Sequence, residues 1–122
     1  EFARIIKKDG VLIITAPFCS LTHFSPYHYF TGFNKYWYEY QLKKFGFDIL
    51  EIASNGNYFS YLSQEINRVP EISVKYADHH LNKMEKLIIK MARKLLMNIN
   101  KEDRGSNELL CFGYHILSKK IK

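Results

Sequence analysis

The sequence predicts an α/β fold, in which helices alternate with the strands of one sheet. An apolar run at 11–16, VLIITA, is followed by a helical pattern at 36–45 and by a second strand pattern at 47–53. A strand, a helix and a strand in this order form a parallel crossover unit. The run at 11–16 is apolar throughout instead of alternating, which predicts a strand buried on both faces. A third strand is expected at 108–118.

Helical patterns lie before the first strand and between the first two strands in the sequence. The spacing of apolar residues at 1–8 predicts the end of a helix, and Asp9-Gly10 then closes it, because glycine readily takes the left-handed conformation. Gly46 is the expected stop of the helix at 36–45 for the same reason.

Two more helices are expected between the second and third strands. Residues 58–68 form the first, with Asn57 as its N-cap and Val69-Pro70 as its end. The longest helical pattern covers residues 74–99, where apolar residues recur at four-three-four spacing: Ala77, Leu81, Met84, Ile88, Met91 and Leu95.

Composition limits the class of protein. The 122 residues, 47% of them hydrophobic, suffice for one compact domain and not for two. The first residue is Glu1 and no charged-then-apolar leader follows, so we expect no signal peptide and a start upstream. No apolar run approaches the roughly 20 residues of a membrane span. Cys19 and Cys111 are too few for a disulfide framework, so we expect reduced thiols in a cytoplasmic protein.

The formal net charge of +6 permits contact with nucleic acid or with an anionic membrane. The excess lies in residues 83–94 and in the tail at 119–122, and we interpret it as a solvated helix face and a tail, with no nucleic-acid partner. The helix at 74–99 could dock on a membrane surface through its apolar stripe and basic face. The favoured interpretation is that it packs on its own domain or on a second copy of the chain.

Two passages carry a resemblance to a known family. EFARIIKKDGVLIITAP, with Ile5-Ile6 before the turn and Gly10 within it, resembles the helix–turn–strand passage of class I S-adenosylmethionine-dependent methyltransferases. YWYEYQLKKFGFDILEI resembles the family's next helix and strand, with Leu42 and Gly46-Phe47 at matching positions. Lys8-Asp9-Gly10 replaces the usual Pro-Gly-Gly turn. The resemblance covers residues 1–53 by motif and 108–118 by position only.

The resemblance implies the C-terminal half of a Rossmann-like methyltransferase domain. Residues 11–16, 47–53 and 108–118 would be strands five, six and seven, with strand seven inserted antiparallel between the other two. Residues 58–99 would be a helical insertion before the last strand, within a single partial domain at 1–122. The cofactor would be S-adenosylmethionine, but the Gly-rich turn that binds it is absent from this sequence. The chain alone is therefore expected to be inactive and to contain no cofactor-binding residue.

The acceptor site would lie beyond the strand at 11–16, since ligands bind outside the carboxyl ends of parallel strands. Residues 17–35 form a long connection there, and its six aromatic side chains are expected to pack against the fold or to line a pocket: Phe18, Phe24, Tyr27, Tyr29, Phe30 and Phe33. Pro17 and Phe18, with Tyr27 and Tyr29, are the expected acceptor-binding residues.

His23 and His28 are the candidate catalytic bases, because histidine titrates near neutral pH. The alternative is that both only satisfy backbone groups of a packed loop. Methyl transfer from a sulfonium often needs only alignment, so a base is not required. Asp78-His79-His80 is interpreted as a polar helix start, and no metal is expected.

A second function class stays open from the sequence. The chain could be a non-catalytic interaction module that retains half of the fold, with the helices at 58–99 as contact surface. In both cases the apolar strand at 11–16 would lack a neighbour on one side, and such an edge favours self-association. The identity of the methyl acceptor is not encoded in any motif.

Overall fold

The computed structural model describes residues 1–23 and 25–122, and these divide into two compact units. One unit contains residues 1–56 and 111–122 and carries the sheet. The other contains residues 57–110 and is helical. The chain is thus α/β, with strands and helices partly segregated along the sequence.

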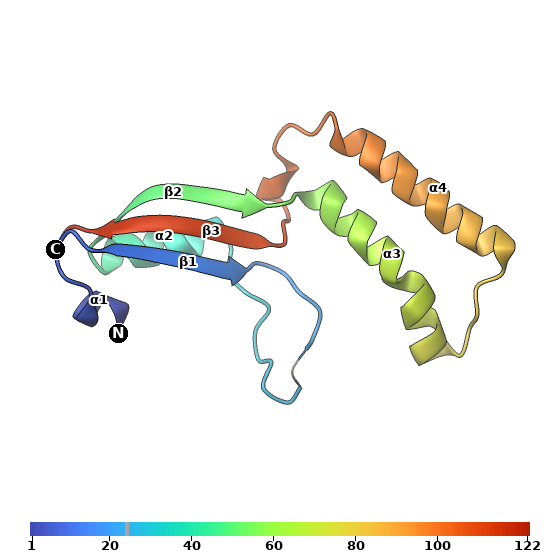
Figure 1. Ribbon diagram of the computed structural model, residues 1–122, viewed down its shortest axis with the longest axis horizontal. Coiled ribbons are helices and arrows are strands. Elements are labelled where there is room, and N and C mark those ends of the chain that lie inside the picture. Colours follow the sequence, from blue (N-terminus) through green and yellow to red (C-terminus); the bar gives the residue numbers. More distant parts are fainter. Residues whose placement is uncertain (24) are drawn as a thin grey trace. The chain divides into compact units, whose positions relative to one another are not determined.

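The sheet has three strands: β1 (Val11–Pro17), β2 (Phe47–Asn55) and β3 (Gly113–Lys120). Their order is β1-β3-β2, and β3 is antiparallel to both neighbours. It follows that β1 and β2 run in the same direction, as the predicted crossover requires, while the last strand of the chain separates them (Figure 1).

The predicted bounds of the last strand, 108–118, are wrong. Residues Ser106–Glu108 form a short 3-10 helix, η1, and the strand begins only at Gly113. The apolar residues Leu109 and Leu110 belong to the connection before the strand, although their hydrophobicity is typical of a strand. The strand instead continues to Lys120, where its basic residues pair with β1 and β2.

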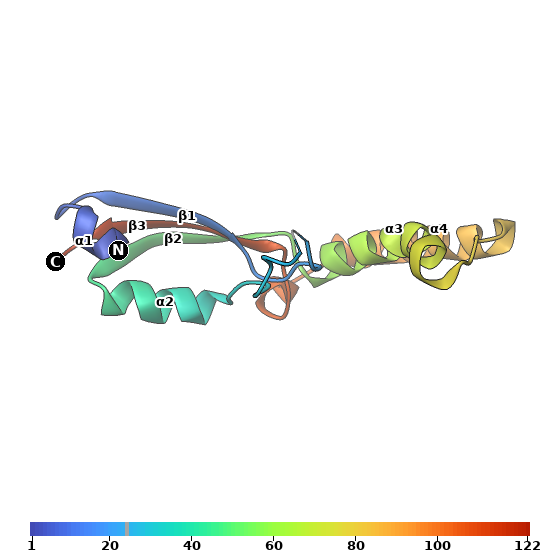
Figure 2. The ribbon, with the colours of Figure 1, turned by 90° about the horizontal axis from the view of Figure 1, so that it is seen from below.

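Helix α2 (Lys35–Lys44) covers one face of the sheet, where the core lies (Figure 2). Ile116 in the middle of β3 is 1% exposed. The Ser118 hydroxyl is buried beside it and donates to the Leu12 carbonyl at 3.2 Å, so the polar group has a partner across the strands. The buried apolar residues of this core are Leu12, Tyr38, Leu42, Phe47, Cys111, Tyr114 and Ile116.

The other face of the sheet is open within this unit. Val11 is 55% and Ile13 is 71% exposed, whereas Leu12 between them is buried. The prediction of a strand buried on both faces is therefore wrong for this chain. The reason is that α2 and the N-terminal turn lie on one side only, and none of the described residues of this unit forms an element over the other side.

The N-terminal helix is a single turn, α1 (Phe2–Ile5), shorter than the predicted residues 1–8. Its closing residue is also different from the expected one, because Asp9 and not Gly10 takes the left-handed conformation, with φ of 68°. The Lys120 ammonium group donates to the carbonyl oxygens of Ala3 and Ile6. A cation at the C-terminal end of a helix is stabilising, so β3 fixes this turn as well as the sheet.

The helical unit is a hairpin of α3 (Tyr58–Ala77) and α4 (Lys83–Asn100). The Asn57 side chain accepts a hydrogen bond from the Ser60 N–H at 2.9 Å, which confirms the predicted N-cap of α3. The predicted break at Val69-Pro70 is wrong, because the helix continues through Pro70 to Ala77. Proline removes only one backbone hydrogen bond, and packing of α3 against α4 retains the later turns.

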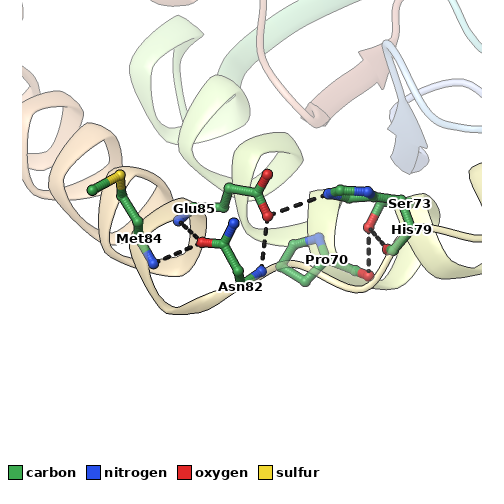
Figure 3. Close-up of polar contacts among 6 residues, drawn as sticks. All are labelled: Pro70, Ser73, His79, Asn82, Met84 and Glu85. Atoms are coloured by element: carbon green, nitrogen blue, oxygen red, sulfur yellow. Dashed lines mark hydrogen bonds and ion pairs between the residues drawn. The ribbon is translucent and has the colours of Figure 1, made fainter.

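The predicted helix at 74–99 is in fact the end of α3, a link and α4. Asp78 adopts a left-handed conformation and ends α3. Asn82 then begins α4 in a capping box: its side chain accepts from the Glu85 N–H at 3.0 Å, while the Glu85 carboxylate accepts from the Asn82 N–H at 2.8 Å. The Glu85 carboxylate also lies 3.2 Å from His79 Nε2 (Figure 3), which gives that histidine a structural contact.

The base of the hairpin is closed by the Asp103 carboxylate. It accepts from the Asn57 side chain at 3.1 Å and from the backbone N–H groups of Gly105 and Ser106. Hydrogen bonds from Ser106, Gly105 and Asn57 hold the pKa of Asp103 below its usual range. The first residue before α3 is thus tied to the turn that follows α4.

No helix among the described residues combines the length and the apolar character that a membrane span requires.

The capping box makes the stability of the helical unit depend on pH. The backbone hydrogen bond from Asn82 holds the pKa of Glu85 below its ordinary value of 4.5, and the contact with His79 acts in the same direction. A lowered folded-state pKa means that this contribution is present above pH 4.5 and is lost as the pH falls through the lowered value. In an NMR titration, the resonance of the Glu85 carboxyl carbon should move upfield as the pH falls, with a midpoint below pH 4.5.

Glu85→Gln is the matched control, because glutamine keeps the capping hydrogen bond without a titrating charge. Thermal melts of this variant should depend less on pH in the acid range than those of the parent chain, with Asp103 supplying part of the remaining dependence. Equal pH dependence of the two proteins would contradict the role of Glu85.

Candidate functional site

The candidate site lies at the edge where β1 and β2 end and β3 begins. Gly113 is the register partner of both Pro17 and Asn55, so three chain segments meet there. The Phe112 N–H donates to the Asn55 carbonyl at 2.9 Å, and the Phe18 N–H donates to the Phe112 carbonyl at 2.9 Å. This edge is the one at which open α/β sheets bind ligands.

Gly113 permits this close approach. A Cβ atom at this position would lie 2.3 Å from the Ala16 carbonyl oxygen and 3.0 Å from the Pro17 Cα. Both are backbone atoms of β1 and have little freedom to move. Glycine is therefore required at the first position of β3, and it leaves a notch of about 220 Å³ beside the strand ends.

Two polar side chains in the wall of the notch form a pair across the strands. Thr15 and His115 are register partners, and Thr15 Oγ1 lies 3.1 Å from His115 Nδ1. Both side chains are exposed on the open face of the sheet. If the hydroxyl accepts from Nδ1–H, the lone pair of Nε2 is available to take a proton; if it donates to Nδ1, then Nε2–H is a donor. In both tautomers Thr15 fixes the orientation of the ring.

Tyr114 supports the notch from the core side. Its ring packs against Phe18 at 5.9 Å and against Tyr38 at 6.3 Å between centroids. Burial, with the neighbouring Cys111 thiol, raises the pKa of Tyr114 well above its ordinary value of 10, so its hydroxyl is protonated at neutral pH. The Cys111 thiol is fully buried and donates to the Gly113 carbonyl at 3.3 Å, which assigns it a packing role.

The long connection between β1 and α2 returns to the same edge. Gly32 has φ of 150°, and a Cβ atom there would lie 1.9 Å from the Pro17 carbonyl oxygen. Phe33 stacks on Trp37 at 4.0 Å. Both ends of the loop are therefore anchored beside the end of β1.

The predicted catalytic pair, His23 and His28, is brought together in this loop. The centroids of the two rings lie 4.5 Å apart at an interplanar angle of 42°. His23 Nδ1 also lies 2.8 Å from the Leu21 carbonyl oxygen, which is the local backbone contact that the alternative interpretation expects. The structure thus shows a histidine pair, one member of which is oriented by the backbone.

The predicted acceptor-binding residues fall into two groups. Pro17 borders the notch at the end of β1, and Phe18 packs its ring on Tyr114. Tyr27 is 78% and Tyr29 is 77% exposed on the loop. The expectation that all six aromatics pack or line a pocket is wrong for Tyr27, Tyr29 and Phe30, because the loop presents them to solvent. Phe24 lies outside the described residues.

Sequence reasoning missed Thr15, Asn55 and His115. The signal that could have located them is the alternation of side chains along a strand. Thr15 is the last residue of β1 on the open face before Pro17, and its cross-strand partner lies at the same edge of the sheet. Finding His115 also required the register of β3, which the misplaced strand bounds concealed.

The remaining candidate groups are possible metal ligands and the two cysteines. Among residues 1–23 and 25–122, no group of three histidine, cysteine or acidic side chains could hold a metal ion. Cys19 and Cys111 are not joined in a disulfide.

Comparison with known proteins adds no family assignment. No family model matches the chain, and neither a curated protein nor a solved structure matches it.

The role of Thr15 in orienting His115 is open to test by Thr15→Val. Valine keeps the β-branched shape on an exposed strand position, so the sheet should be retained, but the hydrogen bond to Nδ1 is lost. We expect the side-chain ¹⁵N resonances of His115 to move in the variant. Thr22→Val, on the exposed loop, is the matched control and should leave them in place. An unchanged His115 spectrum in Thr15→Val would contradict the pair.

Proposed function

We propose that this chain is the C-terminal, acceptor-side part of an S-adenosylmethionine-dependent methyltransferase. The observation that carries the proposal is the strand order β1-β3-β2, with β3 antiparallel between two strands that run in the same direction. This is the arrangement that the resemblance implies for strands five, seven and six. It involves residues 113–120, which lie outside the passages that suggested the family.

The position of the candidate site supports the same proposal. The notch, the Thr15–His115 pair and the loop with His23 and His28 all lie beyond or beside the end of β1, where an acceptor would bind. The open Tyr27 and Tyr29 side chains offer aromatic faces and hydroxyl groups to an acceptor.

We assign the cofactor site to the other half of the domain, because the described residues contain no Gly-rich turn between a strand and a helix. S-adenosylmethionine supplies an electrophilic methyl group when it is bound. The part of the chemistry that belongs to this chain is to hold the acceptor and, for an O–H or N–H acceptor, to take its proton.

His115 is the group best placed for that proton. Thr15 orients the His115 ring, and the His115 side chain borders the notch at the strand ends, whereas His23 and His28 lie on the long loop. His23 and His28 form the second candidate pair. An acceptor that is already deprotonated needs neither, because alignment alone then suffices.

The proposal is tested with the protein expressed from the longest open reading frame that contains this sequence. Isothermal titration with S-adenosylmethionine should show binding by that protein and none by the 122-residue chain, because the cofactor site is assigned to the other half. Binding by the longer protein would separate an enzyme from a non-catalytic interaction module, which has no need of the cofactor. Absence of binding by the longer protein would contradict the proposal.

A further inference from the structure

Helix α4 carries a stripe of apolar side chains that has no partner in the hairpin. Met84, Ile88, Met91 and Leu95 follow one another at four-three-four spacing, and each is at least 58% exposed. This spacing places them on one side of the helix, along about 16 Å of its length. Packing against α3 therefore uses another side of α4, where Ile89, Ala92 and Leu96 are less exposed.

The helix before α4 also exposes an aromatic side chain. Tyr76 in the last turn of α3 is 75% exposed, and residues 78–82 link that turn to α4 (Figure 1). A tyrosine combines an apolar ring with a polar hydroxyl, the combination that suits a boundary between water and lipid.

A row of lysines borders the stripe. Successive helix residues are about 100° apart, so Lys83, Lys90 and Lys94 fall together beside the stripe, on the side away from α3. In all, α4 carries five basic side chains, and Glu85 is its one acid. An apolar stripe with long cationic side chains at its edge is the pattern of a helix that lies in the plane of a membrane surface.

We propose that α4 docks the protein on an anionic membrane surface. The stripe enters the boundary between headgroups and acyl chains, and the row of lysines reaches the phosphate groups of acidic lipids. Charge favours this occupant over a second copy of the chain. In antiparallel stripe-to-stripe packing, two copies would place their rows of lysines along one seam, where they repel, whereas acidic headgroups attract them.

The experiment is flotation of the whole 122-residue chain with vesicles. Vesicles of phosphatidylcholine with about one third phosphatidylglycerol should retain the protein at low salt, while pure phosphatidylcholine should retain much less. Each lysine near an acidic surface is worth about fivefold in the partition coefficient. Replacing Lys83, Lys90 and Lys94 by glutamine should therefore weaken binding by about a hundredfold. Replacing Lys7, Lys8 and Lys44 instead is the matched control with the same change in charge.

The stripe is tested by Ile88→Gln with Met91→Gln, compared with Leu21→Gln with Leu109→Gln, which changes exposed side chains elsewhere. Only the first pair should reduce retention, by at least about tenfold. Circular dichroism checks that the helices remain in each variant. If the Ile88→Gln, Met91→Gln variant unfolds, the variant with the three lysines replaced still tests the proposal. Equal retention by neutral vesicles, or no retention by acidic ones, would overturn the proposal. The proposal would also be overturned if the parent chain forms a dimer in sedimentation and binds no vesicles, and the Ile88→Gln, Met91→Gln variant dissociates that dimer.

Discussion

The structure of the sheet unit depends on β3, the last strand of the chain and the central strand of the sheet. It forms hydrogen bonds to β1 on one side and to β2 on the other, and its residue Ile116 is the largest fully buried side chain among residues 1–23 and 25–122. The Ser118 hydroxyl and the Lys120 ammonium group extend its contacts to β1 and to the N-terminal turn. Because β1 and β2 make no ladder with each other, neither is part of a sheet until the C-terminal residues have arrived. The folding of this unit therefore rests on contacts between residues far apart in sequence, from Asn55 with Gly113 to Val11 with Lys119, and such contacts form slowly in general.

Because β3 pairs with β2, the helical hairpin that lies between them in the sequence must begin and end close together. The chain leaves β2 at Asn55 and must return to the same place at Gly113. Asp103 satisfies part of this requirement inside the helical unit, since it binds Asn57 before α3 and the turn after α4. The sheet therefore needs only that the hairpin begin and end close together. Its outer surface is then available for another role, and the exposed stripe of α4 provides one that is independent of the chemistry at the sheet edge.

The sequence was sufficient for the elements whose signals are local. The strand starts at Val11 and Phe47, the N-cap at Asn57 and the stop at Gly46 follow from apolar runs, a capping side chain and a left-handed glycine. Errors arose where distant contacts decide: packing on α4 carries α3 past Pro70, and only the register of β3 brings His115 to Thr15. The exposure of Ile13 could not be predicted either, because it depends on which elements cover a face of the sheet, and a continuous apolar run carries no information about that.

The site, the N-terminal turn and the proposed function all depend on the position of β3, antiparallel between β1 and β2. The most direct test is a set of backbone NOEs from β3 in uniformly labelled protein. We expect cross-strand NOEs from the residues around Ile116 both to the residues around Ile14 and to those around Ile52, the register partners in β1 and β2. NOEs that pair β1 directly with β2, or that connect β3 to only one of them, would contradict it.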